Sequence, residues 1–463
     1  MIDSSFIKAI GRILPAEAIL TDAADCFAYG YDNSRQQTTP AMVAFPSTEQ
    51  QVAEIVGLCN DHLCPITARG RGTGTAGAAV PAQNSLVLSF EQMNKIIKLD
   101  VENRVMVVQP GVTNQQVQDA AAEAGFFWAP DPTSAAFCSV GGNLAYNSAG
   151  PRAVKYGTCR ENTLGLRAVA GDGRILKCGV YTTKGVVGYD LTRLIIGSEG
   201  TLAIITEATL KLLPKPETRR TLKATYRSIE AAAKAVSTIM AQPVTPCSLE
   251  FMDGNALNMV RDYSSAALPQ DAGAMLMIEV DGSADQMEHS VTAVEAACIN
   301  QGHIETTSAR TEQEIAELWQ TRKALSPSLR KIAPRKINED VVVPVSRLAE
   351  LVKGLDRLSQ HYHIPIVNFG HAGNGNIHVN LLVDTHNKQQ MDNAMPCLDA
   401  VFDLVIDLGG TLSGEHGVGT EKKDFIHKEL SANEVGIMHQ IKALFDPRNL
   451  LNPGKTLPDL KAD

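Results

Sequence analysis

The sequence predicts an α+β protein with a first unit over residues 1–215, a second over residues 216–425 and a C-terminal segment over residues 426–463. Short apolar stretches typical of strands alternate with stretches of helical spacing along the chain. The stretch Lys215-Pro-Glu-Thr-Arg-Arg220 interrupts this pattern with prolines and charges, as at a domain boundary. The length of 463 residues also exceeds what one hydrophobic core usually supports.

The first unit is expected to begin with a strand, a helix and a second strand. Pro46-Ser-Thr-Glu-Gln-Gln51 carries a helix-capping signal of the Ser/Thr-x-x-Gln type. Val52, Ile55, Val56 and Cys59 then follow helical spacing. The two strands of this start are expected at residues 41–45 and 65–68. Further strands are expected at residues 86–88, 105–108 and 202–213, and a helix at 115–124 that ends at Gly125.

The second unit continues the alternation of helices and strands. Residues 228–240 have helical spacing, and residues 274–280 form an apolar run of strand length. A last helix is expected at residues 434–445, followed by an extended tail after Pro447.

Composition and charge exclude several classes of protein. A hydrophobic content of 44% and a charged content of 20% are typical of a soluble globular protein. The net charge of −9, without any basic run, argues against a nucleic-acid surface. No apolar run approaches the ~20 residues of a membrane span, and Met1 to Lys8 does not resemble a signal peptide. We expect a cytoplasmic protein, with peripheral attachment to the inner face of a membrane left open.

The nine cysteines are scattered, and no two of them form a Cys-x-x-Cys pair. Cys59 and Cys64 are the closest pair, and Cys59 falls on the apolar face of a predicted helix. This distribution indicates reduced, structural cysteines in a cytosolic protein. It also excludes an iron–sulfur cluster, which needs grouped thiolates.

A glycine-dense loop follows the second predicted strand. Gly70-Arg-Gly-Thr-Gly-Thr-Ala-Gly77 contains Gly-x-Gly-x-x-Gly, but Pro81 leaves no room for the helix that a Rossmann loop must open. A loop rich in backbone N–H groups can still bind an anion without a helix, and a pyrophosphate is the expected guest. Residues 130–150 and 197–201 form two further glycine-rich tracts that would close over the same ligand. Each loop alone could be a structural turn.

Two short segments, 371–378 and 413–417, carry three histidines and one glutamate among glycines. With Gly373 and Gly375 between them, His371 and His378 can face one point, and Glu415 would complete a common divalent-metal ligand set. His416 remains as a proton acceptor. The alternative is two polar turns with surface histidines.

These motifs together resemble the FAD-dependent 2-hydroxy-acid dehydrogenases of the vanillyl-alcohol-oxidase/PCMH type. This family includes D-lactate dehydrogenase, the glycolate oxidase flavoprotein subunit and D-2-hydroxyglutarate dehydrogenase. The resemblance runs from Pro46 to Lys455 and includes the three glycine tracts, Lys155-Tyr-Gly157, the two histidine segments and Leu451-Asn-Pro-Gly-Lys455. It implies a PCMH-type FAD-binding domain of two α+β subdomains, an α+β cap domain with an antiparallel sheet, and a C-terminal tail that returns to the flavin.

The resemblance also implies roles for individual residues. His371, His378 and Glu415 would bind one divalent metal (zinc, manganese or iron), His416 would be the base, and Arg322 would bind the substrate carboxylate; the alternative for Arg322 is a solvated helix charge. Ser326 and Asn380 would also contact the substrate. The residues expected around FAD are Arg69, Gly70, Arg71, Gly72, Thr73, Gly74, Thr75, Gly77, Pro132, Thr133, Ser139, Gly141, Gly142, Asn143, Asn147, Ser148, Gly150, Gly200, Ile204, Ile205 and Asn452.

The chain departs from the family pattern at three points. Asn374 replaces the aspartate of the metal loop, which lowers the local negative charge. Relatives that act on 2-hydroxyglutarate carry a lysine where this chain has Asn338, so a short monocarboxylate is favoured, although Lys336 is close enough to keep the question open. The glycine loop lacks the histidine that tethers flavin covalently in some relatives, so FAD should be bound non-covalently.

We therefore expect an NAD-independent oxidation of a short D-2-hydroxy acid, D-lactate first, to its 2-oxo acid. Glycolate and D-2-hydroxyglutarate are the alternatives within the family. A zinc hydrolase and a non-catalytic flavin-binding subunit are the alternatives outside it. A quinone, an electron-transfer flavoprotein or a cytochrome would accept the electrons, and a homodimer is left open.

Overall fold

The computed structural model describes residues 2–260, 269–309, 311–333 and 335–459. The chain divides into two compact units. The first unit contains residues 1–150, 157–215 and 415–463, and the second contains residues 151–156 and 216–414. The chain therefore leaves the first unit twice and re-enters it at Glu415, directly after the second unit ends at Gly414.

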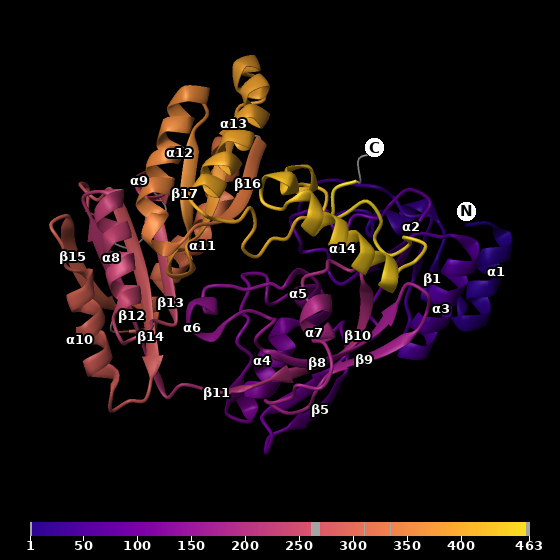
Figure 1. Cartoon of the computed structure of the whole chain (residues 1–463). Coiled ribbons are helices and arrows are strands. Elements are labelled where there is room, and N and C mark those ends of the chain that lie inside the picture. The colour runs from indigo at the N-terminus through magenta and orange to yellow at the C-terminus, as the bar shows by residue number, and fades with distance from the viewer. Residues whose placement is uncertain (1, 261–268, 310, 334, 460–463) are drawn as a thin grey trace. The chain divides into compact units, whose positions relative to one another are not determined.

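The first unit contains a small, mostly parallel sheet with the strand order β1-β2-β4-β3. Figure 1 labels its edge strand β1. Its strands are β1 (Ile19–Leu20), β2 (Met42–Ala44), β3 (Ile66–Arg69) and β4 (Leu86–Ser89). Helix α3 (Glu49–His62) connects β2 to β3 and begins with a capping box in which Thr48 and Gln51 satisfy each other's backbone N–H groups. Helices α1 (Ser4–Ile13) and α2 (Ala23–Phe27) precede this sheet. The sequence predicted the capping box and both flanking strands, and the structure confirms them.

A second, antiparallel sheet of the first unit has the order β5-β6-β10-β8-β9. The strands are β5 (Ile96–Asp100), β6 (Val105–Val108), β8 (Thr163–Ala170), β9 (Ile175–Gly179) and β10 (Ala203–Lys211), and β7 (Phe126–Phe127) pairs with β11 (Leu213–Pro214). Helices α4 (Asn114–Glu123), α5 (Val140–Tyr146) and α7 (Leu191–Ile195) connect these strands. Trp128, Leu144 and Ile205 lie in the hydrophobic core beside this sheet.

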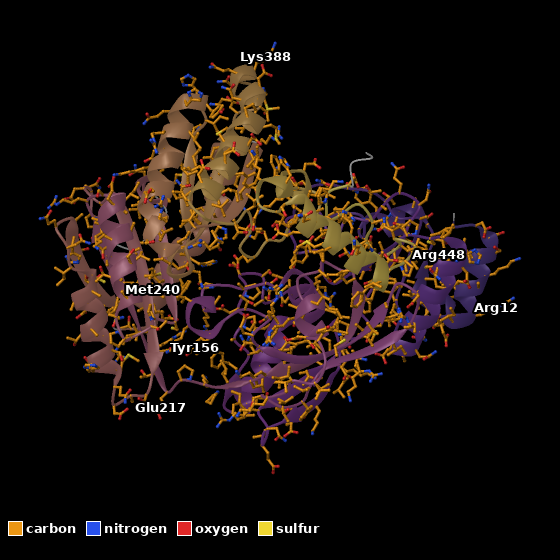
Figure 2. The ribbon with its side chains drawn as sticks, in the orientation of Figure 1. Arg12, Tyr156, Glu217, Met240, Lys388 and Arg448 are labelled. Carbon is orange, nitrogen blue, oxygen red and sulfur yellow. The ribbon has the colours of Figure 1, made fainter. Side chains whose placement is uncertain are left out.

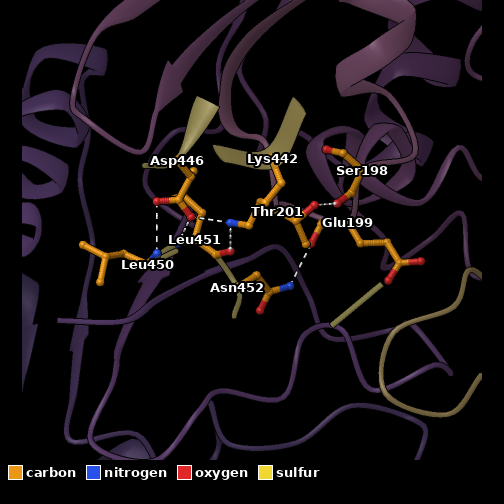
Figure 3. A network of polar contacts seen from close by, with 8 residues as sticks. All are labelled: Ser198, Glu199, Thr201, Lys442, Asp446, Leu450, Leu451 and Asn452. Carbon is orange, nitrogen blue, oxygen red and sulfur yellow. Dashed lines mark hydrogen bonds and ion pairs between the residues drawn. The ribbon is translucent and has the colours of Figure 1, made fainter. Parts of the chain in front are cut away.

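The C-terminal tail is fastened to the first unit by polar contacts (Figure 3). Helix α14 (Ala432–Phe445) ends where Asp446 accepts hydrogen bonds from the N–H groups of Leu450 and Leu451. The buried ammonium of Lys442 pairs with the same carboxylate and donates to the Leu451 carbonyl. Arg448, labelled in Figure 2, donates to the carbonyl of Asn60 at the end of α3.

The second unit is built on an antiparallel sheet with the order β15-β12-β14-β13-β17-β18-β16 (Figure 1). The strands are β12 (Thr218–Tyr226), β13 (Ser248–Asp253), β14 (Ala274–Gly282), β15 (His303–Ala309), β16 (Arg335–Val342), β17 (Ile366–His371) and β18 (Asn376–Val383). The short helix α6 (Ala153–Tyr156) also belongs to this unit, since Lys155 and Tyr156 both bind Asp281 at 2.5 Å and 2.8 Å.

Helices cover this sheet on both faces. Helices α9 (Gly254–Val260) and α11 (Glu312–Ile332) share a hydrophobic core with one face, where Leu325 and Leu329 meet Val367 and Phe369. On the opposite face Tyr226 donates its hydroxyl to the carbonyl of Cys298 in α10 (Met287–Cys298). Helix α10 packs on α8 (Ile229–Ala241), α8 on α12 (Leu348–Tyr362), and α12 on α13 (Lys388–Asp407).

The nine cysteines are all buried and unpaired, as the sequence predicted. In the described ranges no helix is both long enough and apolar enough to span a bilayer.

Candidate active site

A tight hairpin brings His371 and His378 to the same face of the second unit's sheet. His371 ends β17 and His378 lies in β18, and the register pairs His371 with Asn376 and Phe369 with His378. Gly375 makes the turn with a φ of +73°, and a Cβ at this position would lie 1.9 Å from the carbonyl oxygen of Val343. The two imidazole centroids are 5.2 Å apart. The turn that the sequence predicted between the two histidines is confirmed.

Glu415 completes a cluster with these histidines. One ligand atom from each of His371, His378 and Glu415 lies within 4.8 Å of the other two. The preceding residue is fixed by Asp340, which pairs with His378 across the strands: the N–H of Gly414 donates to the carbonyl of Asp340 at 2.8 Å and to its Oδ2 at 2.9 Å. Asp340 thus anchors the chain one residue before Glu415, a role that the sequence did not reveal.

A second buried carboxylate, Glu250, supports the other end of the cluster. Glu250 lies in the middle of β13, where it pairs directly with His371 of β17. Its Oε1 lies 2.5 Å from His371 Nδ1, and its Oε2 accepts a hydrogen bond of 2.8 Å from Arg322 Nε. Burial acts to raise the pKa of Glu250, but His371 and Arg322 together hold that pKa below its usual value. Glu250 is therefore ionised at neutral pH.

Arg322 of α11 is fixed from two sides. Its guanidinium carbon lies 4.7 Å from the centroid of the Phe369 ring, and its Nε is held by Glu250. The side chain is only 12% exposed, and its two terminal amino groups make no hydrogen bond within the described part of the chain. Such a guanidinium is preorganised to bind an incoming carboxylate. The structure therefore does not support the alternative of a solvated helix charge.

Asn380 lies next to the cluster on the same face of β18. Its Nδ2 donates to the carbonyls of Val367 and His378 at 3.1 Å and 3.0 Å. Its Oδ1 is buried and has no hydrogen-bond partner among the described residues. A buried acceptor without a donor is costly, so this oxygen is suited to a hydroxyl or N–H group of a ligand. Ser326 lies in α11, but its side chain lies outside the described part of the structure.

His416 follows Glu415 and is half-exposed. Glu199 holds the following segment within the first unit. Its carboxylate accepts hydrogen bonds from the N–H groups of Val418 at 2.6 Å and Gly419 at 2.7 Å. Glu199 is buried, with burial as the largest cause raising its pKa. The sequence placed Glu199 only in a glycine tract and did not reveal this contact.

The first glycine loop is oriented for anion binding. The carbonyls of Thr73, Gly74 and Ala76 accept hydrogen bonds from the Asn33 side chain, the Asn33 N–H and the Thr420 N–H, respectively. In contrast, the N–H groups from Gly70 to Gly77 donate no hydrogen bond within the described residues. A row of unused N–H groups is the donor set that a pyrophosphate needs.

The glycines of this loop also permit close approach. A Cβ on Gly70 would lie 2.2 Å from Ser139 Oγ, and one on Gly74 would lie 2.6 Å from the Tyr146 hydroxyl. Burial, together with the carboxylates of Glu199 and Asp32, raises the pKa of Tyr146 well above its usual value, so the hydroxyl stays neutral. The loop therefore fits a phosphate-bearing cofactor.

The second glycine tract differs from the first. The N–H groups of Val140 and Gly141 donate to the carbonyls of Val112 and Pro110, and those of Gly142 and Asn143 bind Ser139. These groups are therefore already used within the protein. Gly141 instead allows close packing, since a Cβ there would lie 2.6 Å from the Pro110 side chain.

Several polar side chains expected around FAD are also bound within the protein. Arg69 directs its guanidinium to the carbonyls of Tyr31 and Ala28, and Asn147 accepts from Thr158 Oγ1 and from the N–H of Arg160. Arg71 lies 3.5 Å from Glu91. Among the remaining residues, Gly72, Gly150 and Gly200 have positive φ angles, Ile204 and Ile205 are buried in β10, and Thr75, Pro132, Thr133 and Ser148 lie in loops.

Asn452 of the C-terminal tail forms hydrogen bonds to the segment after the first glycine loop and to the third glycine tract. Its Nδ2 donates to the carbonyl of Ala78 at 2.9 Å and to that of Glu199 at 2.7 Å, a contact that Figure 3 shows for Glu199. Its Oδ1 accepts from Lys455 Nζ at 2.7 Å. Burial lowers the pKa of Lys455 to about 8. Asn452 therefore shapes the glycine loops through hydrogen bonds within the protein.

A cavity of about 580 Å³ lies elsewhere in the second unit. It is lined by residues at the start of β17 and the end of α12, among them Ile366 and His363. Two of its polar groups are used within the protein, since Asn255 Nδ2 donates to the Ile366 carbonyl and Ser359 Oγ donates to the Ile364 carbonyl. We place the chemistry at the histidine cluster instead.

Two family models match the chain. Residues 215–456 match the family described as FAD linked oxidases, C-terminal domain, and residues 40–179 match the family described as FAD binding domain. The chain belongs to the FAD-linked oxidase family. It is therefore an FAD-dependent oxidoreductase, which does not fit the hydrolase alternative.

Named relatives span nearly the whole chain. A protein of Bacillus subtilis (strain 168) named glycolate oxidase subunit GlcD is 41% identical over 428 residues, which are 92% of this chain and 91% of the relative. A protein of Archaeoglobus fulgidus named D-lactate dehydrogenase is 36% identical, with coverage of 94% and 96%. One of Stutzerimonas stutzeri named D-2-hydroxyglutarate dehydrogenase is 30% identical, with coverage of 98% and 99%.

The solved structure of p-cresol methylhydroxylase with substrate bound matches with a TM-score of 0.79, at 19% identity, over 99% of this chain and 97% of that one. At this identity the likeness shows the fold alone, and it confirms the expected PCMH-type architecture.

Proposed function

We propose that this chain oxidises a short D-2-hydroxy acid, with D-lactate as the first candidate, to the 2-oxo acid. The observation that carries the proposal is the pairing of a metal-ligand cluster with Arg322, which shares Glu250 with His371. When bound, non-covalent FAD supplies the hydride acceptor, and a divalent metal at His371, His378 and Glu415 supplies Lewis-acid stabilisation of the substrate hydroxyl oxygen.

The protein's own groups bind the substrate, accept its proton and bind the cofactor. The terminal amino groups of Arg322 bind the substrate carboxylate and fix its orientation. Asn380 Oδ1 accepts a hydrogen bond from the substrate. An imidazole nitrogen of His416 accepts the hydroxyl proton as general base. The backbone N–H groups of the Gly70–Gly77 loop bind the pyrophosphate of FAD.

Charge supports a monocarboxylate. Arg322 brings one positive charge to the substrate side of the cluster, through terminal amino groups that Glu250 does not bind. One substrate carboxylate neutralises that charge, whereas a second would need its own cation. Asn338, which pairs with Asn380 across the strands, offers none. Lys336 lies two residues before Asn338 in β16 and therefore on the same face of the sheet. Because Lys336 could supply the second cation, the dicarboxylate D-2-hydroxyglutarate is the competing substrate.

Glycolate is the second candidate, because the relative with 41% identity is named a glycolate oxidase subunit. It is also a short monocarboxylate and differs from lactate only by a methyl group. A quinone, an electron-transfer flavoprotein or a cytochrome would re-oxidise the flavin.

The test is anaerobic bleaching of the flavin by D-lactate, L-lactate, glycolate and D-2-hydroxyglutarate. We expect D-lactate to give a higher kcat/KM than L-lactate and D-2-hydroxyglutarate. A clear preference for the dicarboxylate would contradict the charge argument and point to Lys336. Absence of bleaching by all four acids would refute the proposed function.

A further inference from the structure

Glu250 is placed between two groups that the proposed function uses separately. The register of β13 and β17 sets Glu250 directly opposite His371, so both side chains leave the sheet on the same face. Its two oxygens then contact different partners, Oε1 at 2.5 Å from His371 Nδ1 and Oε2 at 2.8 Å from Arg322 Nε. The carboxylate is fully buried, so water does not offer a substitute for either partner.

The contact with His371 selects the nitrogen that faces the metal. A carboxylate only accepts hydrogen bonds, so the proton of His371 lies on Nδ1. Nε2 is then the nitrogen with a lone pair for a metal. A carboxylate behind a ligand histidine fixes the ring and makes the ligand more basic.

The contact with Arg322 fixes the guanidinium that binds the substrate carboxylate. With Nε held by Glu250 and the guanidinium against Phe369, the terminal amino groups have one defined position. The Phe369 ring lies 5.8 Å from that of His378, its cross-strand partner. Arg322 is therefore linked to both ligand histidines, through Glu250 to one and through Phe369 to the other.

Resting on the proposed function, we infer that Glu250 is a positioning residue that couples metal binding at His371 to carboxylate binding at Arg322. Two donors face position 250, and a carboxylate has an acceptor oxygen for each. A glutamine has a single acceptor oxygen, and its amino group would face the other donor. Glu250→Gln must therefore leave His371 or Arg322 without its acceptor.

The first experiment measures the Zn²⁺ affinity of metal-depleted protein by competition with a chromophoric chelator. We expect Glu250→Gln to weaken Zn²⁺ binding about 10- to 100-fold, the usual effect of losing the partner of a ligand histidine. The matched control is Asp253→Asn. It removes another buried carboxylate from the same strand, but one that binds Ala256 and Asn368. The control should stay within about three-fold of the wild type.

A double-mutant cycle separates coupling from a general loss of structure. In an Arg322→Met background only His371 faces position 250, and the single oxygen of a glutamine can accept from it. Glu250→Gln should then weaken Zn²⁺ binding by less than about three-fold. Equal losses in the two backgrounds would show that Glu250 does not couple the two groups.

The second readout is the dissociation constant of pyruvate, followed by the absorbance change of bound flavin in the Zn²⁺-loaded protein. Glu250→Gln should weaken pyruvate binding at least about 10-fold, the size expected when a charge-assisted contact is lost. Unchanged affinities for both Zn²⁺ and pyruvate would overturn the inference, even if D-lactate bleaches the flavin. A non-additive Zn²⁺ cycle without bleaching by any hydroxy acid would instead retain the positioning role and refute the proposed function.

Discussion

Replacement of Asn452 tests whether the C-terminal tail shapes the cofactor loops. Asn452→Ala removes two donated hydrogen bonds, to the carbonyls of Ala78 and Glu199, and two accepted ones, from Lys455 and from Thr67 Oγ1 at 3.3 Å. Bonds between neutral groups contribute about 1 kcal/mol each and a bond to a charged group about 1.5–3 kcal/mol. Lys455 would still donate hydrogen bonds to the carbonyls of Ala78 and Val80 in the variant, which reduces the cost of losing its contact with Asn452. We therefore expect a loss of roughly 3–5 kcal/mol.

Asn449→Ala is the matched control. Asn449 and Asn452 both have left-handed backbone angles, with φ of 52° and 47°, so an alanine adds the same backbone strain at either position. Asn449 is exposed, and its side chain makes no hydrogen bond within the described residues. The difference between the two variants therefore isolates the side-chain contacts of Asn452.

Thermal unfolding and flavin release measure the outcome. A loss of 3–5 kcal/mol should lower the melting temperature by roughly 10 °C, at about 2–4 °C per kcal/mol for a unit of this size. The variant should also release FAD more readily, because Ala78 directly follows the Gly70–Gly77 loop and Glu199 lies in the tract of residues 197–201. Melting temperatures within 2 °C of each other and equal FAD affinity in Asn452→Ala and Asn449→Ala would refute the reasoning (the threshold corresponds to less than about 1 kcal/mol).

Three further outcomes are expected. Burial, aided by Asp356, raises the pKa of Asp253 from 3.8 to about 7. The folded state therefore binds this proton more tightly than the unfolded state does. The free energy of unfolding falls as the pH rises from 4 to 7, by up to about 1.4 kcal/mol per pH unit. Asp253→Asn should flatten that slope in urea unfolding, and parallel wild-type and variant profiles would contradict the assignment. Gly375→Ala should abolish metal binding or folding because of the clash with the Val343 carbonyl, and a metal affinity equal to that of the wild type would exclude this turn as the organiser of the histidines. His416→Ala should leave FAD and metal bound but slow flavin reduction about 10²–10⁴-fold, and stopped-flow rates equal to those of the wild type would remove His416 as the base.

The sequence predicts the local elements well because their signals are local. The capping box at Thr48, the stop at Gly125 and the apolar run of β14 each depend on a few neighbouring residues, and the structure places an element at each. The histidine hairpin belongs to the same class, since the glycines that allow it lie between His371 and His378.

The supports of the site could not be predicted in this way. Glu250 reaches His371 only because β13 and β17 are neighbours in a sheet whose order does not follow the chain. A glutamate within the apolar run Leu249-Glu-Phe-Met252 is a signal of a buried charge, but sequence spacing gives no register between strands 121 residues apart. The hydrogen bonds from Gly414 to Asp340 and from Val418 to Glu199 also join residues that lie far apart in the sequence.

The three supporting groups share a chemical reason for being carboxylates. An ionised carboxylate accepts at both oxygens and donates at neither, so it dictates which atoms of its neighbours must face it. At Glu250 these are His371 Nδ1 and Arg322 Nε, whereas at Glu199 they are two successive backbone N–H groups. An amide of the same shape has one acceptor oxygen, so it could accept from only one of the two donors at each place. The cost of burying the charge at Glu250 is offset by Arg322, and that same pairing fixes the orientation of the guanidinium.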